Sequence, residues 1–179
     1  MRQLVVLLMG LFAAATALAQ PTQWRDKNGR ALPDTEFRRS LNGLGGMLII
    51  TEDKDWRKKW ESGDGSQKDF RQVGTIARGT QVFVLAFFSN PKSDAGGRVD
   101  LLCDFDVAEP GGKNVMHKTD VICFQGVLKG KPHDVYLAAP VFNFLPEGSD
   151  PLGTYTVRMS FKDKLGNTTL PLQSRFTLE

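Results

Sequence analysis

Residues 98–107 read RVDLLCDFDV, and this stretch decides the fold class. Every second position carries an apolar side chain: Val99, Leu101, Cys103, Phe105 and Val107. Aspartates alternate with them, and Leu102 is the one exception. Alternation with a period of two is typical of a strand with one buried face and one wet face. The stretch therefore predicts an antiparallel sheet that covers an apolar core.

Strand signals recur on both sides of this stretch, with turn residues between them. The predicted strands cover residues 47–51, 81–89, 98–107, 120–124, 135–144, 154–161 and 168–178. Pro140 interrupts the fifth of them. Trp56 and Trp60 are four residues apart in a charged segment, which predicts a short helix. About seven strands and one N-terminal helix indicate an all-β antiparallel sandwich.

The N-terminal residues have the layout of a secretory signal peptide. Arg2 precedes an apolar run, and the small residues Ala17-Leu18-Ala19 follow it. Cleavage after Ala19 would make Gln20 the mature N-terminus. The run is too short for a permanent anchor, and no cysteine follows it. We expect a periplasmic or secreted protein with no stable membrane anchor after cleavage.

The chain beyond the signal peptide (1–19) is short enough for one folded domain. Residues 20–44 are polar and rich in turn formers, so we expect an N-terminal arm with at most a short helix near Asp34–Ser40. Residues 45–179 would form the sandwich, including a helix and loop at 53–70.

The two cysteines, Cys103 and Cys123, predict one structural disulfide in an exported chain. They lie at similar distances from the predicted turn at Pro110–Gly112, so the bridge would link two strands of one hairpin. The alternative is a catalytic thiol, which would need one free cysteine and a polarising histidine.

A resemblance supports the sandwich. Residues 150–159 (DPLGTYTVRM), the polar turn at 163–167 and the closing Phe176-Thr177-Leu178 resemble the last two strands of bacterial immunoglobulin-like domains. The turn at 107–113 is similar to a hairpin of the same group. The resemblance covers residues 75–179 and implies an immunoglobulin-like fold. It implies no catalytic residues, because these domains share none.

Composition and motifs argue against several functions. The net charge is +3, with Arg2 included, and nucleic-acid binding usually needs a strongly basic surface. His117 and His133 are the only histidines and do not make a zinc site. Neither a Gly-x-Ser-x-Gly nor a His-Glu-x-x-His motif occurs. We therefore expect no catalytic residues, no metal and no cofactor.

Two groups of residues keep functional alternatives open. Asp100, Asp104 and Asp106 would share the wet face of their strand, as carboxylates in a hydrolase or as ordinary surface residues. Trp56, Arg57, Trp60 and Phe70 form a candidate interaction patch. Alternatively, the helix caps an open end of the sandwich, with its indoles in the core.

The sequence thus predicts a non-catalytic binding or assembly module that contacts another envelope protein. An inhibitor or accessory subunit of an envelope enzyme is one alternative. A hydrolase with dispersed catalytic residues is the other.

Overall fold

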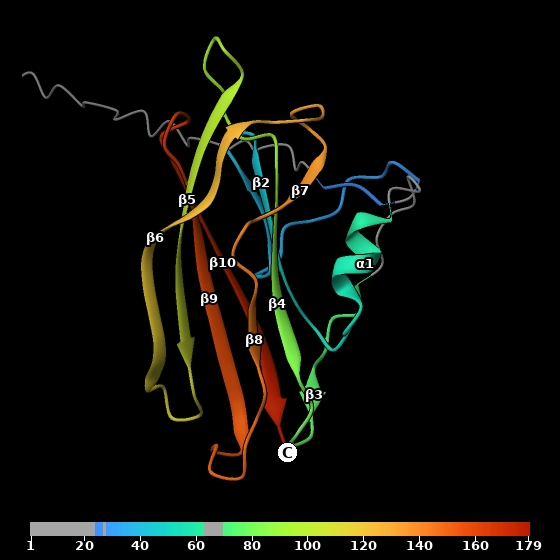
Figure 1. Cartoon of the computed structure of the whole chain (residues 1–179), viewed down its shortest axis with the longest axis vertical. Helices are drawn as coiled ribbons and strands as arrows, with labels where there is room; N and C mark the ends of the chain where they lie inside the picture. Colours follow the sequence, from blue (N-terminus) through green and yellow to red (C-terminus); the bar gives the residue numbers. More distant parts are fainter. Residues whose placement is uncertain (1–23, 27, 63–69) are drawn as a thin grey trace, which may run out of the picture.

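The computed structural model of the chain describes residues 24–26, 28–62 and 70–179 (Figure 1). The predicted signal peptide, its cleavage site and part of the loop predicted at 53–70 lie outside these residues. The described chain forms two β-sheets and one short helix, α1 (Trp56–Glu61). The prediction of an all-β fold is confirmed. No helix in the described ranges is long and apolar enough to cross a membrane.

Five strands form each sheet. Sheet 1 contains β1 (Arg38–Leu41), β2 (Leu44–Thr51), β4 (Val82–Ser89), β7 (Val135–Leu137) and β8 (Phe142–Phe144). Its order is β1-β2-β4, and both β7 and β8 pair with β4. Sheet 2 contains β3 (Thr75–Ile76), β10 (Thr168–Leu178), β9 (Gly153–Asp163), β5 (Arg98–Ala108) and β6 (Asn114–Val127), in that order. All pairs are antiparallel except β3 with β10.

The seven predicted strands correspond to β2, β4, β5, β6, β9, β10 and the pair β7 and β8. The described residues form ten strands because β7 and β8 are separate and because β1 and β3 were not predicted. Pro140 lies between β7 and β8, where the missing N–H of proline ends strand pairing.

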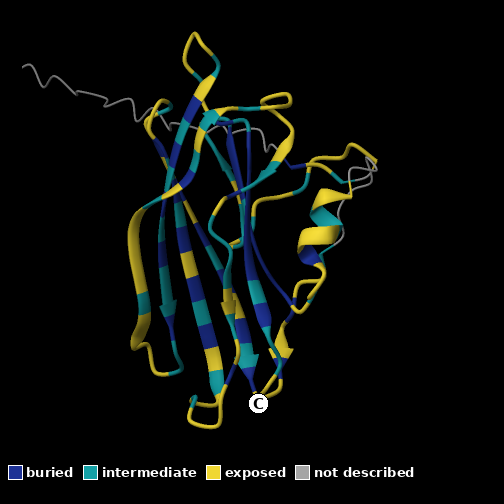
Figure 2. Cartoon of the chain, in the orientation of Figure 1, coloured by how far each residue is buried: buried dark blue, intermediate teal, exposed yellow. Residues whose placement is uncertain are grey.

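The main core lies between the two sheets and follows the alternation of the sequence. Along β9, burial alternates from residue to residue (Figure 2). Tyr155, Met159 and Phe161 of β9 are at most 2% exposed. The intervening residues Arg158 and Ser160 stay at the surface or half-buried. The alternating stretches therefore face the core on one side only.

Sheet 1 has a second apolar layer on its outer face, which lies away from sheet 2. Helix α1 lies on this side of β4 (Figure 1). Trp56 contacts Phe83, with ring centroids 6.3 Å apart, and Trp60 contacts Phe87 at 5.3 Å. Trp24, near the N-terminus, is buried in the same cluster. Helix α1 therefore covers a face of sheet 1 and not an open end of the sandwich, so the predicted position is wrong. The predicted burial of the indoles is confirmed for Trp56, and Trp60 is half-buried.

The N-terminal arm also differs from the prediction. No helix forms near Asp34–Ser40, because Arg38–Leu41 is strand β1 and pairs with β2. Asn42 and Gly43 join the two strands with φ angles of 50° and 88°. This left-handed pair is the tight hairpin turn that Asn-Gly favours. Sheet 1 therefore begins before the predicted boundary at residue 45.

The first and last parts of the described chain touch one another. The backbone N–H of Gln173 in β10 donates to the carbonyl oxygen of Glu36, at 2.7 Å. The carboxylate of Glu36 also pairs with the guanidinium of Arg175. The segment before β1 thus leaves sheet 1 and contacts β10 of sheet 2.

Candidate functional site

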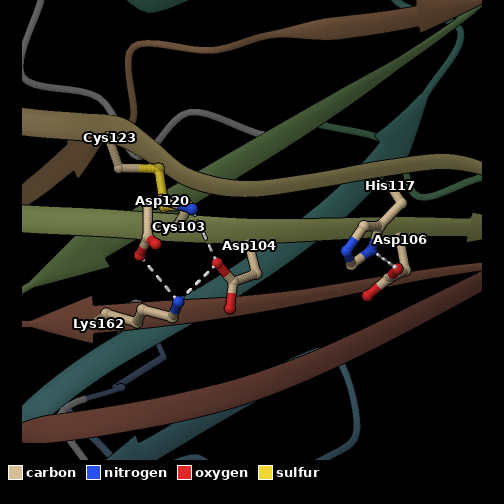
Figure 3. A network of polar contacts seen from close by, with 7 residues as sticks. All are labelled: Cys103, Asp104, Asp106, His117, Asp120, Cys123 and Lys162. Carbon is tan, nitrogen blue, oxygen red and sulfur yellow. Dashed lines mark hydrogen bonds and ion pairs between the residues drawn. A yellow bond between two sulfur atoms is a disulfide. The ribbon is translucent and has the colours of Figure 1, made fainter.

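The outer face of sheet 2 carries charged side chains from three neighbouring strands (Figure 3). Lys162 of β9 lies between Asp104 of β5 and Asp120 of β6, with its Nζ 2.7 Å and 2.9 Å from their Oδ1 atoms. Two residues further along β5, Asp106 contacts His117 of β6, with Oδ1 and Nδ1 2.5 Å apart. These contacts tie β5 to both of its neighbours.

A β-bulge in β6 places Asp120 in this network. Lys118 pairs with Phe105 and Val121 pairs with Cys103, so Thr119 and Asp120 together lie opposite Asp104. Asp120 has a φ of 52°, in the left-handed region. Its backbone N–H donates to the Asp104 carboxylate at 3.0 Å. The Asp104 side chain therefore satisfies a backbone group that the bulge removes from the ladder.

Electrostatics keep Asp104 ionised. Partial burial raises its pKa, but hydrogen bonds from Lys162 and the Asp120 N–H, with the nearby positive charges, outweigh this effect. The net result is a pKa below the usual value for aspartate. The pKa of Lys162 is raised by its hydrogen bonds to Asp104 and Asp120. A general acid in glycoside hydrolysis needs a raised carboxyl pKa, so Asp104 is poorly suited to that role.

The other two aspartates of β5 are engaged in a similar way. Asp100 accepts a hydrogen bond from the Gln125 amide at 2.9 Å, and Asp106 contacts His117. Each aspartate of the row thus has a partner on β6. Within the described ranges, no three His, Cys, Asp or Glu side chains converge as a set of metal ligands.

A shallow groove continues from this network across β9 and β10. Its lining includes Glu36, Arg39, Asp106, Arg158 and Gln173. The Arg158 guanidinium donates to the Gln173 amide oxygen at 3.0 Å. The groove therefore carries both signs of charge, and Asp104, Asp106 and Glu36 each pair with a residue outside its lining.

The predicted disulfide lies beneath the network. Cys103 of β5 and Cys123 of β6 are bonded, with Cα atoms 5.8 Å apart, and both are fully buried. Cys123 lies at a second irregularity, because Ile122 pairs with Leu102 whereas Phe124 pairs with Leu101. The prediction of a cross-strand structural disulfide is confirmed. A disulfide of this kind is typical of an oxidising compartment.

The members of the predicted interaction patch face different ways. Trp56 is 8% exposed, and Trp60 and Phe70 both pack on Phe87 of β4. Arg57 points to solvent and stacks over the Trp56 ring at 4.8 Å. The structure thus brings the three aromatic rings together against sheet 1 and leaves the arginine at the surface.

Strand β6 exposes apolar side chains that sequence reasoning missed. Val115, Ile122 and Val127 are 50%, 54% and 56% exposed. Strand β6 pairs with β5, and no other described strand pairs with its second edge. The N–H of Ala139 donates to the carbonyl of Cys123 at 2.9 Å and closes the edge at that point. We call residues 115–122 the open edge.

A sequence signal for the open edge exists but is weak. The prediction placed a strand only at residues 120–124, because the polar residues His117, Lys118 and Thr119 precede it. The bulge at Thr119 and Asp120 explains this, since it shifts the alternation by one residue. The β-branched residues on either side of the polar run were the available indication.

No protein-family model matches the sequence, and no curated protein matches it. Weak structural likenesses include a Niemann-Pick type C2 protein from Japanese carpenter ant, with a TM-score of 0.37 and 13% identity, covering 74% of this chain and 89% of that one. A family 123 glycoside hydrolase from Clostridium perfringens has a TM-score of 0.40 at 10% identity, over 75% of this chain and 27% of the enzyme. The alkylpurine DNA glycosylase AlkC of Pseudomonas fluorescens has a TM-score of 0.40 at 11% identity, over 76% of this chain and 30% of the enzyme. The chain spans about a third or less of the two enzymes, and likenesses at this level define neither a family nor an activity.

Proposed function

We propose that this protein is an exported, non-catalytic binding or assembly module with an immunoglobulin-like sandwich. It acts in the cell envelope through protein–protein contacts. The open edge of β6 is the observation that carries this proposal. An unpaired strand edge presents N–H and C=O groups that a strand of another chain can bind, and proteins normally shorten or cover such edges.

The dimensions and side chains of β6 support this role. The strand spans 14 residues, which is long for an edge strand. Val115 and Ile122, at the two ends of the open edge, are each at least half exposed. Alternate apolar side chains along an edge supply specificity in strand addition, while the backbone supplies affinity.

The remaining features agree with an envelope protein that binds a partner. The Cys103–Cys123 disulfide supports an oxidising compartment, in line with the predicted signal peptide. The charged groups on sheet 2 form contacts between strands. They lie on the wet outer face of sheet 2, beside the open edge.

Site-specific photocrosslinking in cells tests the proposal. A benzoylphenylalanine at position 115 should give an adduct with a partner protein on irradiation, and Ile122→Lys on the same chain should abolish the adduct. The matched control is benzoylphenylalanine at position 127, which is equally exposed on the same strand but lies beyond the contact at Cys123. Absence of an adduct from position 115, or equal adducts from both positions, would refute the proposal.

A further inference from the structure

The open edge is bounded at both ends. Residues 109–113 form the turn before β6, and the Ala139 bond closes the edge at Cys123. At most nine residues of β6, from Asn114 to Ile122, are therefore available to a binding strand, and the open edge comprises the last eight of them. This length is close to that of an average strand.

The sequence of the open edge is complementary to itself. If two copies pair in antiparallel orientation about a twofold axis between Lys118 and Thr119, Val115 faces Ile122 of the second copy. Met116 then faces Val121, and His117 faces Asp120. Apolar residues thus meet apolar residues at both ends, and a basic residue meets an acidic one nearer the axis. Directly opposed pairs of this kind stabilise antiparallel sheets.

In this register the faces match for Met116 with Val121 and for His117 with Asp120. At the axis, Lys118, on the core side with Phe105, meets Thr119 of the bulge. His117 contacts Asp106 on the outer face of sheet 2, and Ile122 pairs with Leu102, which lies on the same face as Asp104. Val115 lies at a further register shift of β6, where Met116 pairs with Val107 and Asn114 pairs with Ala108, and its side chain is half exposed. Met116 and Val121 pair with Val107 and Cys103 on the core side. A shift of one residue would place outer side chains against core-side ones.

We propose that the open edge binds a second copy of this chain through antiparallel β6–β6 pairing. The pairing joins two copies of sheet 2 into one continuous sheet. It is isologous, because the same eight residues are used on both copies. The inference rests on the proposed function, since it names the partner of the same edge.

One feature sets the strength of this dimer. The Lys118 side chains of both copies lie next to the twofold axis, where like charges repel. Lysine on an edge strand is also a common device against uncontrolled pairing. The dimer is therefore reversible, and Lys118→Ser should tighten it.

Sedimentation equilibrium of the mature chain between about 1 and 500 µM tests the proposal. We expect a monomer–dimer equilibrium. Val115→Lys alone, or Ile122→Glu alone, should raise the dissociation constant about tenfold or more, because each places a charge against an apolar residue. The double variant carries both changes on one chain, so opposite charges face each other at both ends. It should restore the wild-type constant to within about threefold.

Val127→Lys is the matched control and should leave the dissociation constant unchanged. Thermal melts of each monomer show that the variants are folded, since all three side chains are at least half exposed. A monomer at every concentration, an equal effect of Val127→Lys, or no restoration in the double variant would overturn the pairing. If the wild type is monomeric but position 115 still crosslinks a different protein, this inference fails and the proposed function stands. If neither occurs, both fail.

Discussion

Sheets 1 and 2 share one core but are stabilised in different ways. Strand β4 of sheet 1 is buried on both faces, with Val84 and Phe88 towards sheet 2 and Leu85 and Phe87 towards helix α1. Sheet 2 has a wet outer face, where ion pairs link its strands, and a disulfide on its buried side joins β5 to β6. The comparison shows that apolar packing covers both faces of sheet 1, whereas polar and covalent links join the strands of sheet 2. The edge strand β6 of sheet 2 pairs with β5 alone among the described strands.

The largest expected effect is on the covered face of sheet 1. Phe87 is 2% exposed and packs against Trp60 and Phe70. Phe87→Ala should lower the free energy of unfolding by about 3–5 kcal/mol, as truncation of a buried aromatic ring does. The matched change on sheet 2, Ile122→Ala, should stay within about 0.5 kcal/mol because its side chain is 54% exposed. Urea unfolding measures both, and equal losses would remove the distinction between the sheets.

The next effect concerns the disulfide of sheet 2. The bridge closes a segment with a sequence separation of 20 residues. Replacing both cysteines by alanine should cost about 3 kcal/mol of unfolding free energy in the chain-entropy model. In hydrogen exchange, amides of β5 and β6 should lose more protection than those of β2 and β4.

Reduction provides the control for this prediction. Dithiothreitol should lower the stability of the wild type by a similar amount and leave the double alanine variant unchanged. A wild type whose unfolding is insensitive to reduction would show that strand pairing alone holds β6 in place.

The smallest effect is the pH dependence of the charged network. The pKa of Asp104 is lowered in the folded state, so its contribution is fully present above the unfolded value of about 3.9. It is lost as the pH falls through the lower folded pKa. In Asp104→Asn, the free energy of unfolding should therefore fall less between about pH 4 and pH 2 than in the wild type.

An NMR titration of the Asp104 carboxyl tests the cause directly. Lys162→Met removes the side-chain hydrogen bond and the nearby charge, so the pKa of Asp104 should rise relative to the wild type. An unchanged pKa of Asp104 would mean that the Asp120 N–H and the nearby His117 account for the lowered value.

Local patterns in the sequence predicted much of sheet 2. Alternation identified β5, β9 and β10, and the spacing of Cys103 and Cys123 from the turn gave the disulfide. The wet face of Asp104 and Asp106 followed from the same period. The partners of these aspartates could not be predicted, because Lys162 lies on β9, which becomes a neighbour of β5 only in the folded sheet.

Sheet 1 was harder to predict for a related reason. The uninterrupted apolar run of β4 indicates burial on both faces, but it does not identify the covering element. The position of α1 depends on contacts such as Trp60 with Phe87, between elements distant in sequence. The Asn42-Gly43 turn was the exception, since it is a local hairpin signal within residues 20–44, which we predicted as a polar arm.

The contact between Glu36 and β10 has a consequence for the order of folding. Glu36 and Arg175 are 139 residues apart in sequence, and this ion pair joins the start of sheet 1 to the last strand of sheet 2. A chain that emerges N-terminus first must wait for almost its whole length before this contact can form. Such long-range closure gives a high contact order, and domains of this topology fold in milliseconds to seconds. Until Thr168–Leu178 arrives, β9 has only β5 as a neighbour and its other edge stays unpaired. This interval is therefore the time when the chain most needs protection from aggregation.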